Sequence, residues 1–170
     1  MASVSSQGAS SSSASSSSTS RWKYDVFLSY RGKDTGDFTD DLYTHLVRKC
    51  IFTFRNNEKE KLESGNLVSP ELMKALEESR IAIVILSREY VSSTRCLDEL
   101  AKIVKCMKEM EMIVLSVFYG VDLSHVRDQS GTFEQAFTER ETSYSIQKVE
   151  TWRNALGEVA NVSAWHIEER

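Results

Sequence analysis

The feature that most constrains the fold is an uninterrupted run of six apolar residues at positions 81–86. A strand with one face in water alternates apolar and polar side chains, whereas this run has no polar position. It therefore indicates a strand that is covered on both faces. Such strands are typical of parallel sheets that lie between two layers of helices.

Apolar runs of strand length alternate with helical patterns along the chain. Further strands are predicted at residues 24–30, 51–54 and 112–119. Apolar residues at helical spacing predict helices after residue 34, from residue 70, and over residues 96–108, 132–140 and 148–160. This alternation predicts an α/β fold, a flavodoxin-like parallel sheet of four to five strands with helices on both faces and strand order 2-1-3-4. A short fifth strand would lie between residue 143 and the last helix or after that helix, and residues 120–131 are expected to form a loop.

Composition excludes several classes of protein. The chain has 170 residues and a formal net charge of −4, which fits one domain and argues against general nucleic-acid binding. No apolar stretch approaches the roughly 18 residues that a membrane-spanning helix needs. The three cysteines are odd in number and widely spaced, so neither a disulfide framework nor a metal site is expected. We interpret them as reduced thiols of an intracellular protein.

The first twenty residues differ in composition from the rest. Twelve of them are serine and none has a charged side chain. Such a segment cannot bury enough apolar surface to offset the entropy lost on ordering. Residues 1–21 are therefore predicted to be a disordered tail, with the folded domain at 22–170. An organellar transit peptide is the alternative, but such peptides carry several arginines and the first arginine here is Arg21.

Charged residues stand at the predicted ends of two strands. Arg31 and Gly32 follow the first strand, and Glu99 follows the third strand after a short loop, in the first turn of a helix. These strands are neighbours at the point where the strand order reverses, and α/β folds bind ligands at that point. Position alone leaves simpler interpretations open. The helix dipole favours a glutamate in a first turn, Glu99 could pair with Lys102, and Arg31 could be a solvated loop charge.

A series of short motifs occurs in a fixed order along the folded region. They are Tyr24-Asp25-Val26-Phe27-Leu28-Ser29-Tyr30-Arg31-Gly32, Thr53-Phe54, Ser92-Ser93, Cys96-Leu97-Asp98-Glu99-Leu100, Val117-Phe118-Tyr119-Gly120-Val121-Asp122, Ser124-His125-Val126-Arg127, Gly131-Thr132-Phe133, Trp152-Arg153-Asn154-Ala155-Leu156 and Ala164-Trp165-His166. In these motifs and their order the chain resembles the plant Toll/interleukin-1 receptor (TIR) domain, as found in TIR-type disease resistance proteins. The resemblance covers nearly the whole of residues 24–166.

The resemblance implies a domain of plant innate-immunity signalling that is located in the cytoplasm, with the nucleus as a second location. It implies self-association, binding to other TIR domains, and hydrolysis of NAD+ at the nicotinamide–ribose bond, an NAD+ nucleosidase activity of the glycohydrolase or cyclase type. NAD+ would be the substrate, and no cofactor is expected. The chain is too short to hold the nucleotide-binding domain and leucine-rich repeats that usually follow in plant resistance proteins. A TIR-only protein or a part of a longer one is therefore expected.

The resemblance also assigns roles to residues. Glu99 would be the catalytic residue, because its carboxylate could stabilise or capture the positive charge that develops on the ribose as nicotinamide leaves. The substrate would be contacted from three places. These are the loop after the first strand (Arg31, Gly32, Lys33, Asp34, Thr35 and Gly36), Gly65 after the second strand, and Arg95. Self-association would use the first helix at Asp40, Asp41 and His45.

Departures from the family pattern at Arg95, Gly36 and Asp41 leave a second function open. Arg95 stands where relatives usually carry a tryptophan, so base stacking would depend on a guanidinium. The adjacent acids Asp40 and Asp41 would repel a second copy across a two-fold interface. The alternative function is therefore a non-catalytic adaptor or decoy that acts through homotypic TIR–TIR binding.

Overall fold

The structure is a computed structural model that describes residues 21–55, 68–162 and 164–168. Its centre is a five-stranded sheet in which every neighbouring pair of strands is parallel, in the order β2-β1-β3-β4-β5. The strands are β1 (Tyr24–Ser29), β2 (Thr53–Arg55), β3 (Ser79–Leu86), β4 (Ile113–Tyr119) and β5 (Ala164–Ile167). The predicted α/β class and the flavodoxin-like order are confirmed.

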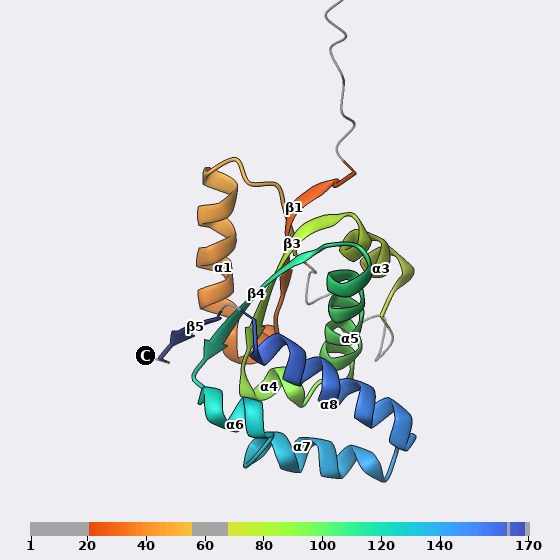
Figure 1. Cartoon of the computed structure of the whole chain (residues 1–170). Helices are drawn as coiled ribbons and strands as arrows, with labels where there is room; N and C mark the ends of the chain where they lie inside the picture. Colours follow the sequence, from red (N-terminus) through yellow and green to blue (C-terminus); the bar gives the residue numbers. More distant parts are fainter. Residues whose placement is uncertain (1–20, 56–67, 163, 169–170) are drawn as a thin grey trace, which may run out of the picture.

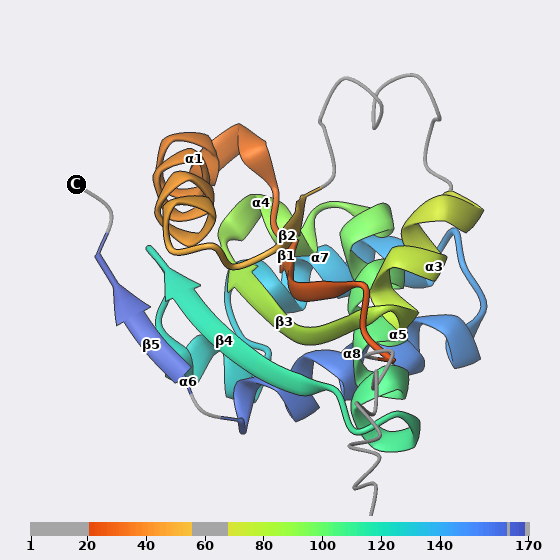
Figure 2. The ribbon, with the colours of Figure 1, turned by 90° about the horizontal axis from the view of Figure 1, so that it is seen from above.

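Seven helices are described, and they lie on both faces of the sheet (Figures 1 and 2). They are α1 (Gly32–Arg48), α3 (Pro70–Glu77), α4 (Arg88–Val91), α5 (Thr94–Glu109), α6 (Leu123–Asp128), α7 (Thr132–Glu141) and α8 (Ile146–Ala160). Helix α1 covers one face, and α3, α5 and α8 cover the other. The two layers are therefore unequal in size.

The side chains of the central strands divide between two cores. Val26 and Leu28 of β1 face α1, in a cluster with Ile85 of β3. Phe27 of β1 and Val84 of β3 point to the opposite face, in the larger cluster with residues of α3, α5 and α8. Because successive residues of a strand face opposite ways, a strand between two helical layers needs apolar residues at every position. This explains the apolar run at 81–86.

Local sequence signals define several helix starts. The Ser69 hydroxyl accepts a hydrogen bond from the Leu72 N–H at 3.2 Å, and Pro70 follows in the first helical position. Ser93 caps α5 through the Cys96 N–H at 3.3 Å, and Ser145 caps α8 through the Lys148 N–H at 3.2 Å. Each cap satisfies a backbone donor that the first helical turn leaves without a partner.

Several predicted boundaries are wrong. The second strand begins at Thr53, because the preceding residues lead out of α1. The third strand begins at Ser79, two residues before the apolar run. Residues 123–128 form helix α6, whose N-cap Asp122 accepts from the Ser124 N–H at 2.8 Å, where a continuous loop was expected. The fifth strand lies after the last helix, which settles the alternative left open by the sequence.

Other predictions concern the chain end, the thiols and the membrane. Arg21, which was assigned to the tail, donates a hydrogen bond to the Met110 carbonyl and stacks on Trp22, whereas residues 1–20 lie outside the described part. All three cysteines are free, and Cys96 and Cys106 are buried. None of the helices in the described ranges is both long and apolar enough to cross a membrane.

Candidate functional site

The carboxyl ends of β1 and β3 meet α4 and the first turns of α1 and α5. Short helix α4 contacts both longer helices, so it joins the two segments that the sequence analysis assigned to the site. These segments lie at the lower end of the sheet in Figure 1. The position agrees with the rule that parallel α/β sheets bind ligands at the point where strand order reverses.

Two charged residues of α5 are buried at this edge. Arg95 is 5% exposed and Glu99 is 4% exposed. They are four residues apart on one helix, so they lie on the same face of α5. Glu99 lies in the second turn, because α5 begins at Thr94, and not in the first turn as predicted. The helix dipole therefore acts on it less strongly than expected.

A buried tyrosine lies beside this carboxylate. The Tyr90 hydroxyl of α4 is 2.7 Å from the Ser29 hydroxyl at the end of β1, and neither residue is exposed to solvent. Burial raises the pKa of Tyr90 well above its ordinary value, and the nearby charge of Glu99 raises it further. The hydrogen bond with Ser29 opposes this shift. Sequence analysis missed both residues. The available signal was Ser29 itself, a polar residue at the end of an otherwise buried run.

Lys102, which the sequence suggested as a partner of Glu99, pairs with a different acid. The Lys102 ammonium is 2.5 Å from the Glu77 carboxylate of α3. The hydrogen bond from Lys102 lowers the pKa of Glu77, and the same bond raises the pKa of Lys102. Lys102 therefore links α3 to α5 on the outside of the domain.

The segment predicted to be a loop after the first strand is helical from Gly32 onward. Asp34 holds it in place, because its carboxylate accepts from the Ser87 hydroxyl at 2.8 Å and from the Glu89 N–H at 3.1 Å. The Lys33 ammonium is 3.1 Å from the Glu89 carboxylate, and the buried Thr35 hydroxyl donates to the Arg31 carbonyl at 2.8 Å. These contacts fix the start of α1 to the end of β3.

A pocket opens at the start of α1. It has a volume of about 280 Å³ and is lined by residues 32–37 together with Tyr119 of β4. The half-buried Arg31 lies directly before it, and its guanidinium has no hydrogen bond or ion pair with the described residues. A Cβ added at Gly36 would meet nothing within 4 Å, so packing does not require glycine there. Gly65 lies outside the described residues.

The predicted interface residues lie on the outer part of α1. Asp40 forms an ion pair with Arg55 of β2, and the Arg55 guanidinium stacks on Tyr43 at 4.2 Å. Asp41 is exposed, and its carbonyl oxygen is 2.8 Å from the His45 Nδ1 atom. Arg55 offsets the charge of Asp40, so the expected repulsion between copies rests on Asp41.

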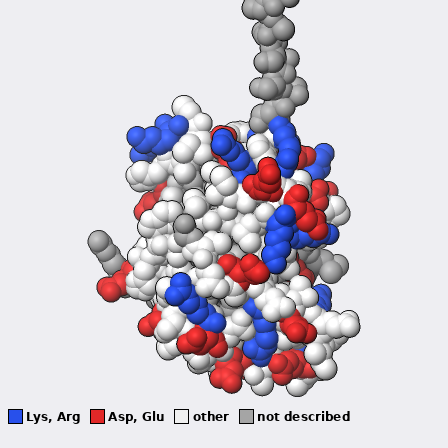
Figure 3. Space-filling model, viewed as in Figure 1, with Lys and Arg blue, Asp and Glu red and all other residues white. Residues whose placement is uncertain are grey.

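Charges are mixed on the face drawn in Figure 3. Lysine and arginine side chains alternate with acidic ones, and the middle of this face is largely uncharged. The described residues on this face form no broad basic patch of the kind that binds nucleic acid.

The fold and the site together define a doubly wound α/β domain with a buried carboxylate at its ligand-binding edge. The family model described as "TIR domain" matches residues 23–170. The chain therefore belongs to the TIR domain family, as the motifs predicted.

The relatives are disease resistance proteins of plants. The chain is 48% identical to disease resistance protein RPV1 of Vitis rotundifolia over 98% of its own length and 12% of that protein's. It is 49% identical to TMV resistance protein N of Nicotiana glutinosa over 85% of its own length and 13% of that protein's. The chain thus spans about an eighth of these relatives.

A solved structure is also similar. It is the TIR domains of the activated Roq1 resistosome, described as directly recognising the pathogen effector XopQ. Its TM-score is 0.77 at 45% identity, and the match covers 85% of this chain and 87% of that one. At this identity the likeness extends beyond the fold to the amino-acid sequence.

Proposed function

We propose that this domain acts in plant innate-immunity signalling by cleaving NAD+ at the nicotinamide–ribose bond. The observation that carries the proposal is Glu99, a carboxylate only 4% exposed at the carboxyl edge of the sheet. Burying an ionisable group of this kind is unfavourable, so fold stability alone gives little reason to place one there. Membership of the TIR family and the similarity to plant resistance proteins support the signalling role.

The proposed cleavage requires little from the protein beyond a correctly positioned negative charge. Positive charge develops on the ribose as nicotinamide leaves, and the Glu99 carboxylate would stabilise that charge or capture it covalently. Arg31 would pair with a phosphate of the substrate, since its guanidinium has no partner among the described residues. Gly32 and Gly36 line the adjoining pocket, which would admit one part of the dinucleotide. The proposal assigns Arg95 and Gly65 to the substrate as well.

Self-association is the second part of the proposal. The similar Roq1 structure is described as an activated resistosome containing TIR domains, which supports assembly of TIR domains with one another. In this chain the exposed side of α1, with Asp41 and His45, would form one contact. Asp41→His should strengthen association, because it removes a repeated negative charge. Unchanged sedimentation of that variant across protein concentrations would argue against α1 as an interface.

The adaptor function remains the second candidate because of two observations. Lys33 and Asp34, both expected to contact substrate, are bound to Glu89 and Ser87 within the chain. Arg95, which replaces an aromatic residue in the family, is buried. A domain with a disabled pocket could still bind other TIR domains.

Nicotinamide release separates the two functions. Purified protein at high concentration is incubated with NAD+, and free nicotinamide is followed over time. Wild type should release nicotinamide and Glu99→Ala should not. Glu109→Ala is the matched control, because Glu109 is an exposed glutamate on the same helix. No release by wild type at any protein concentration would favour the adaptor function.

A further inference from the structure

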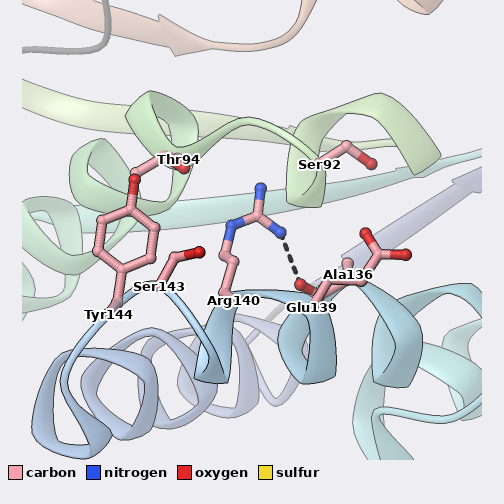
Figure 4. A pocket seen from close by; sticks show the side chains of 7 residues that line it. All are labelled: Ser92, Thr94, Ala136, Glu139, Arg140, Ser143 and Tyr144. Atoms are coloured by element: carbon pink, nitrogen blue, oxygen red, sulfur yellow. Dashed lines mark hydrogen bonds between the residues drawn. The ribbon is translucent and has the colours of Figure 1, made fainter.

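A second pocket lies between α7 and the segment that joins α4 to α5 (Figure 4). Its volume is about 200 Å³, and Ser92, Thr94, Ala136, Glu139, Arg140, Ser143 and Tyr144 line it. The Arg140 side chain extends from the end of α7 toward Ser92 and Thr94. Neither the proposed NAD+ cleavage nor the proposed self-association uses this pocket.

The charge of Arg140 is not balanced within the described structure. Its Nη1 donates to the Ala136 carbonyl at 2.7 Å, whereas its buried Nε has no hydrogen-bond partner, and no carboxylate of the described residues lies within ion-pair distance. Partial burial of the guanidinium lowers the pKa of Arg140. Arg153 on the neighbouring helix is different, since it pairs with Glu141 at 2.9 Å.

The one acid in the pocket is directed to another partner. Glu139 Oε1 accepts from the Gln135 side chain at 3.0 Å. Its charge lies close enough to favour the ionised form of Arg140 without forming an ion pair with it. Glu139 therefore moderates the positive potential of the pocket but does not cancel it.

The remaining lining suits the oxygens of an anion. The hydroxyls of Thr94, Ser143 and Tyr144 make no hydrogen bond with other described residues, so each can donate to a ligand. Thr94 is the first residue of α5, a helix of 16 residues whose positive end faces this side. A guanidinium, several free hydroxyls and a helix start together make an oxyanion-binding environment.

We propose that the Arg140 pocket binds a phosphate group. A guanidinium matches two phosphate oxygens at once, and the hydroxyls supply further donors. Pockets for drug-sized ligands usually run from about 300 to about 1,000 Å³, so this pocket admits a single anionic group rather than a whole dinucleotide. The group could be inorganic phosphate or the phosphate of a nucleoside monophosphate, and both present the same oxygens.

The first experiment locates binding on the full chain by NMR of ¹⁵N-labelled protein. Inorganic phosphate and adenosine monophosphate are titrated separately at constant ionic strength, with chloride as the reference salt. Saturable shifts at the amides of Thr94 and Ser143 are expected, with half-saturation below about 10 mM. Tighter binding of the nucleotide would identify the source as a phosphate ester, and equal binding would identify the free anion. Shifts that never saturate at these amides, with either probe, would overturn the proposal.

Variants test whether Arg140 is the anchor. Arg140→Met should lower the affinity for phosphate by tenfold or more, and Arg48→Met is the matched control at an exposed arginine on α1. Glu139→Gln should increase the affinity several-fold, because it removes the one negative charge from the lining. If Arg140→Met fails to fold, Glu139→Gln still tests the proposal. An unchanged or weakened affinity in Glu139→Gln would contradict an anion site.

Discussion

The starts of α1 and α5 occupy the same edge of the sheet but use their charged side chains in different ways. At the start of α1, Lys33 and Asp34 bind Glu89 and Ser87, and thereby connect the ends of two strands. At the start of α5, Glu99 is buried beside Tyr90. The first arrangement contributes to stability, whereas the second buries an ionisable group where stability alone gives little reason for one. The comparison suggests that chemistry resides on α5 and that α1 supports it.

The largest expected effect is on catalysis by α5. Glu99→Gln keeps the shape of the side chain and removes its charge, so nicotinamide release should fall at least about 100-fold, or about 2.7 kcal/mol of transition-state stabilisation. Asp34→Asn is the matched control on α1, and it should lower the rate only a few-fold. Initial rates of nicotinamide release measure both. Equal losses of activity in the two variants would contradict the proposed difference between the starts of α1 and α5.

The next effect is on stability and concerns α1. Asp34→Ala leaves the Ser87 hydroxyl and the Glu89 N–H without their acceptor in a partly buried place. We expect the free energy of unfolding to fall by about 2 kcal/mol, since a donor left unsatisfied loses more than one hydrogen bond contributes. Urea denaturation followed by circular dichroism measures the change. A loss below about 0.5 kcal/mol would show that Asp34 does not hold the two strand ends together.

Tyr90, which lies beside Glu99 of α5, should make the stability of the domain depend on pH. Its pKa in the folded protein is raised well above the ordinary value of 10.0, chiefly by burial. Above that ordinary value the unfolded chain releases a proton that the folded chain retains. Stability should therefore be unaffected by Tyr90 below about pH 10 and should decline as pH rises further, by up to about 1.4 kcal/mol per pH unit.

The control for this pH effect is Tyr90→Phe. It should lose about 1 kcal/mol at neutral pH, because the Ser29 hydroxyl loses its partner. It should also lack the Tyr90 part of the decline at alkaline pH. Denaturant titrations of both proteins at several pH values measure the difference. If the stabilities of wild type and Tyr90→Phe changed in parallel with pH, the raised pKa of the buried Tyr90 hydroxyl would be contradicted.

Sequence patterns predicted the sheet well because burial on both faces leaves a clear local signal. The run at 81–86 has no polar residue, and the structure places it in the centre of the sheet as part of β3. Short elements gave weaker signals. Helix α6 has one fully buried side chain, Val126, so no apolar period distinguished it from a loop.

The start of α1 could not be predicted from local sequence. Two glycines within residues 32–36 favoured a loop. The helix begins there because Asp34 bonds to residues 87 and 89, which are more than fifty positions away in sequence. The motifs identified Glu99, but its proximity to Tyr90 depends on the packing of α4 against α5. Contacts of this kind appear only when the elements are assembled.

The smallest expected effect tests whether α1 supports the site or also binds substrate. Lys33 is exposed, and its ion pair with Glu89 lies at the surface. Such pairs contribute less than about 1 kcal/mol, because water and salt screen both charges. Lys33→Met should therefore change stability by less than that amount and leave the KM for NAD+ within about two-fold of wild type. Steady-state kinetics of nicotinamide release measure the second quantity. A tenfold rise in KM with unchanged kcat would mean that Lys33 leaves Glu89 to bind a phosphate, and the start of α1 would then belong to the substrate site as fully as the start of α5.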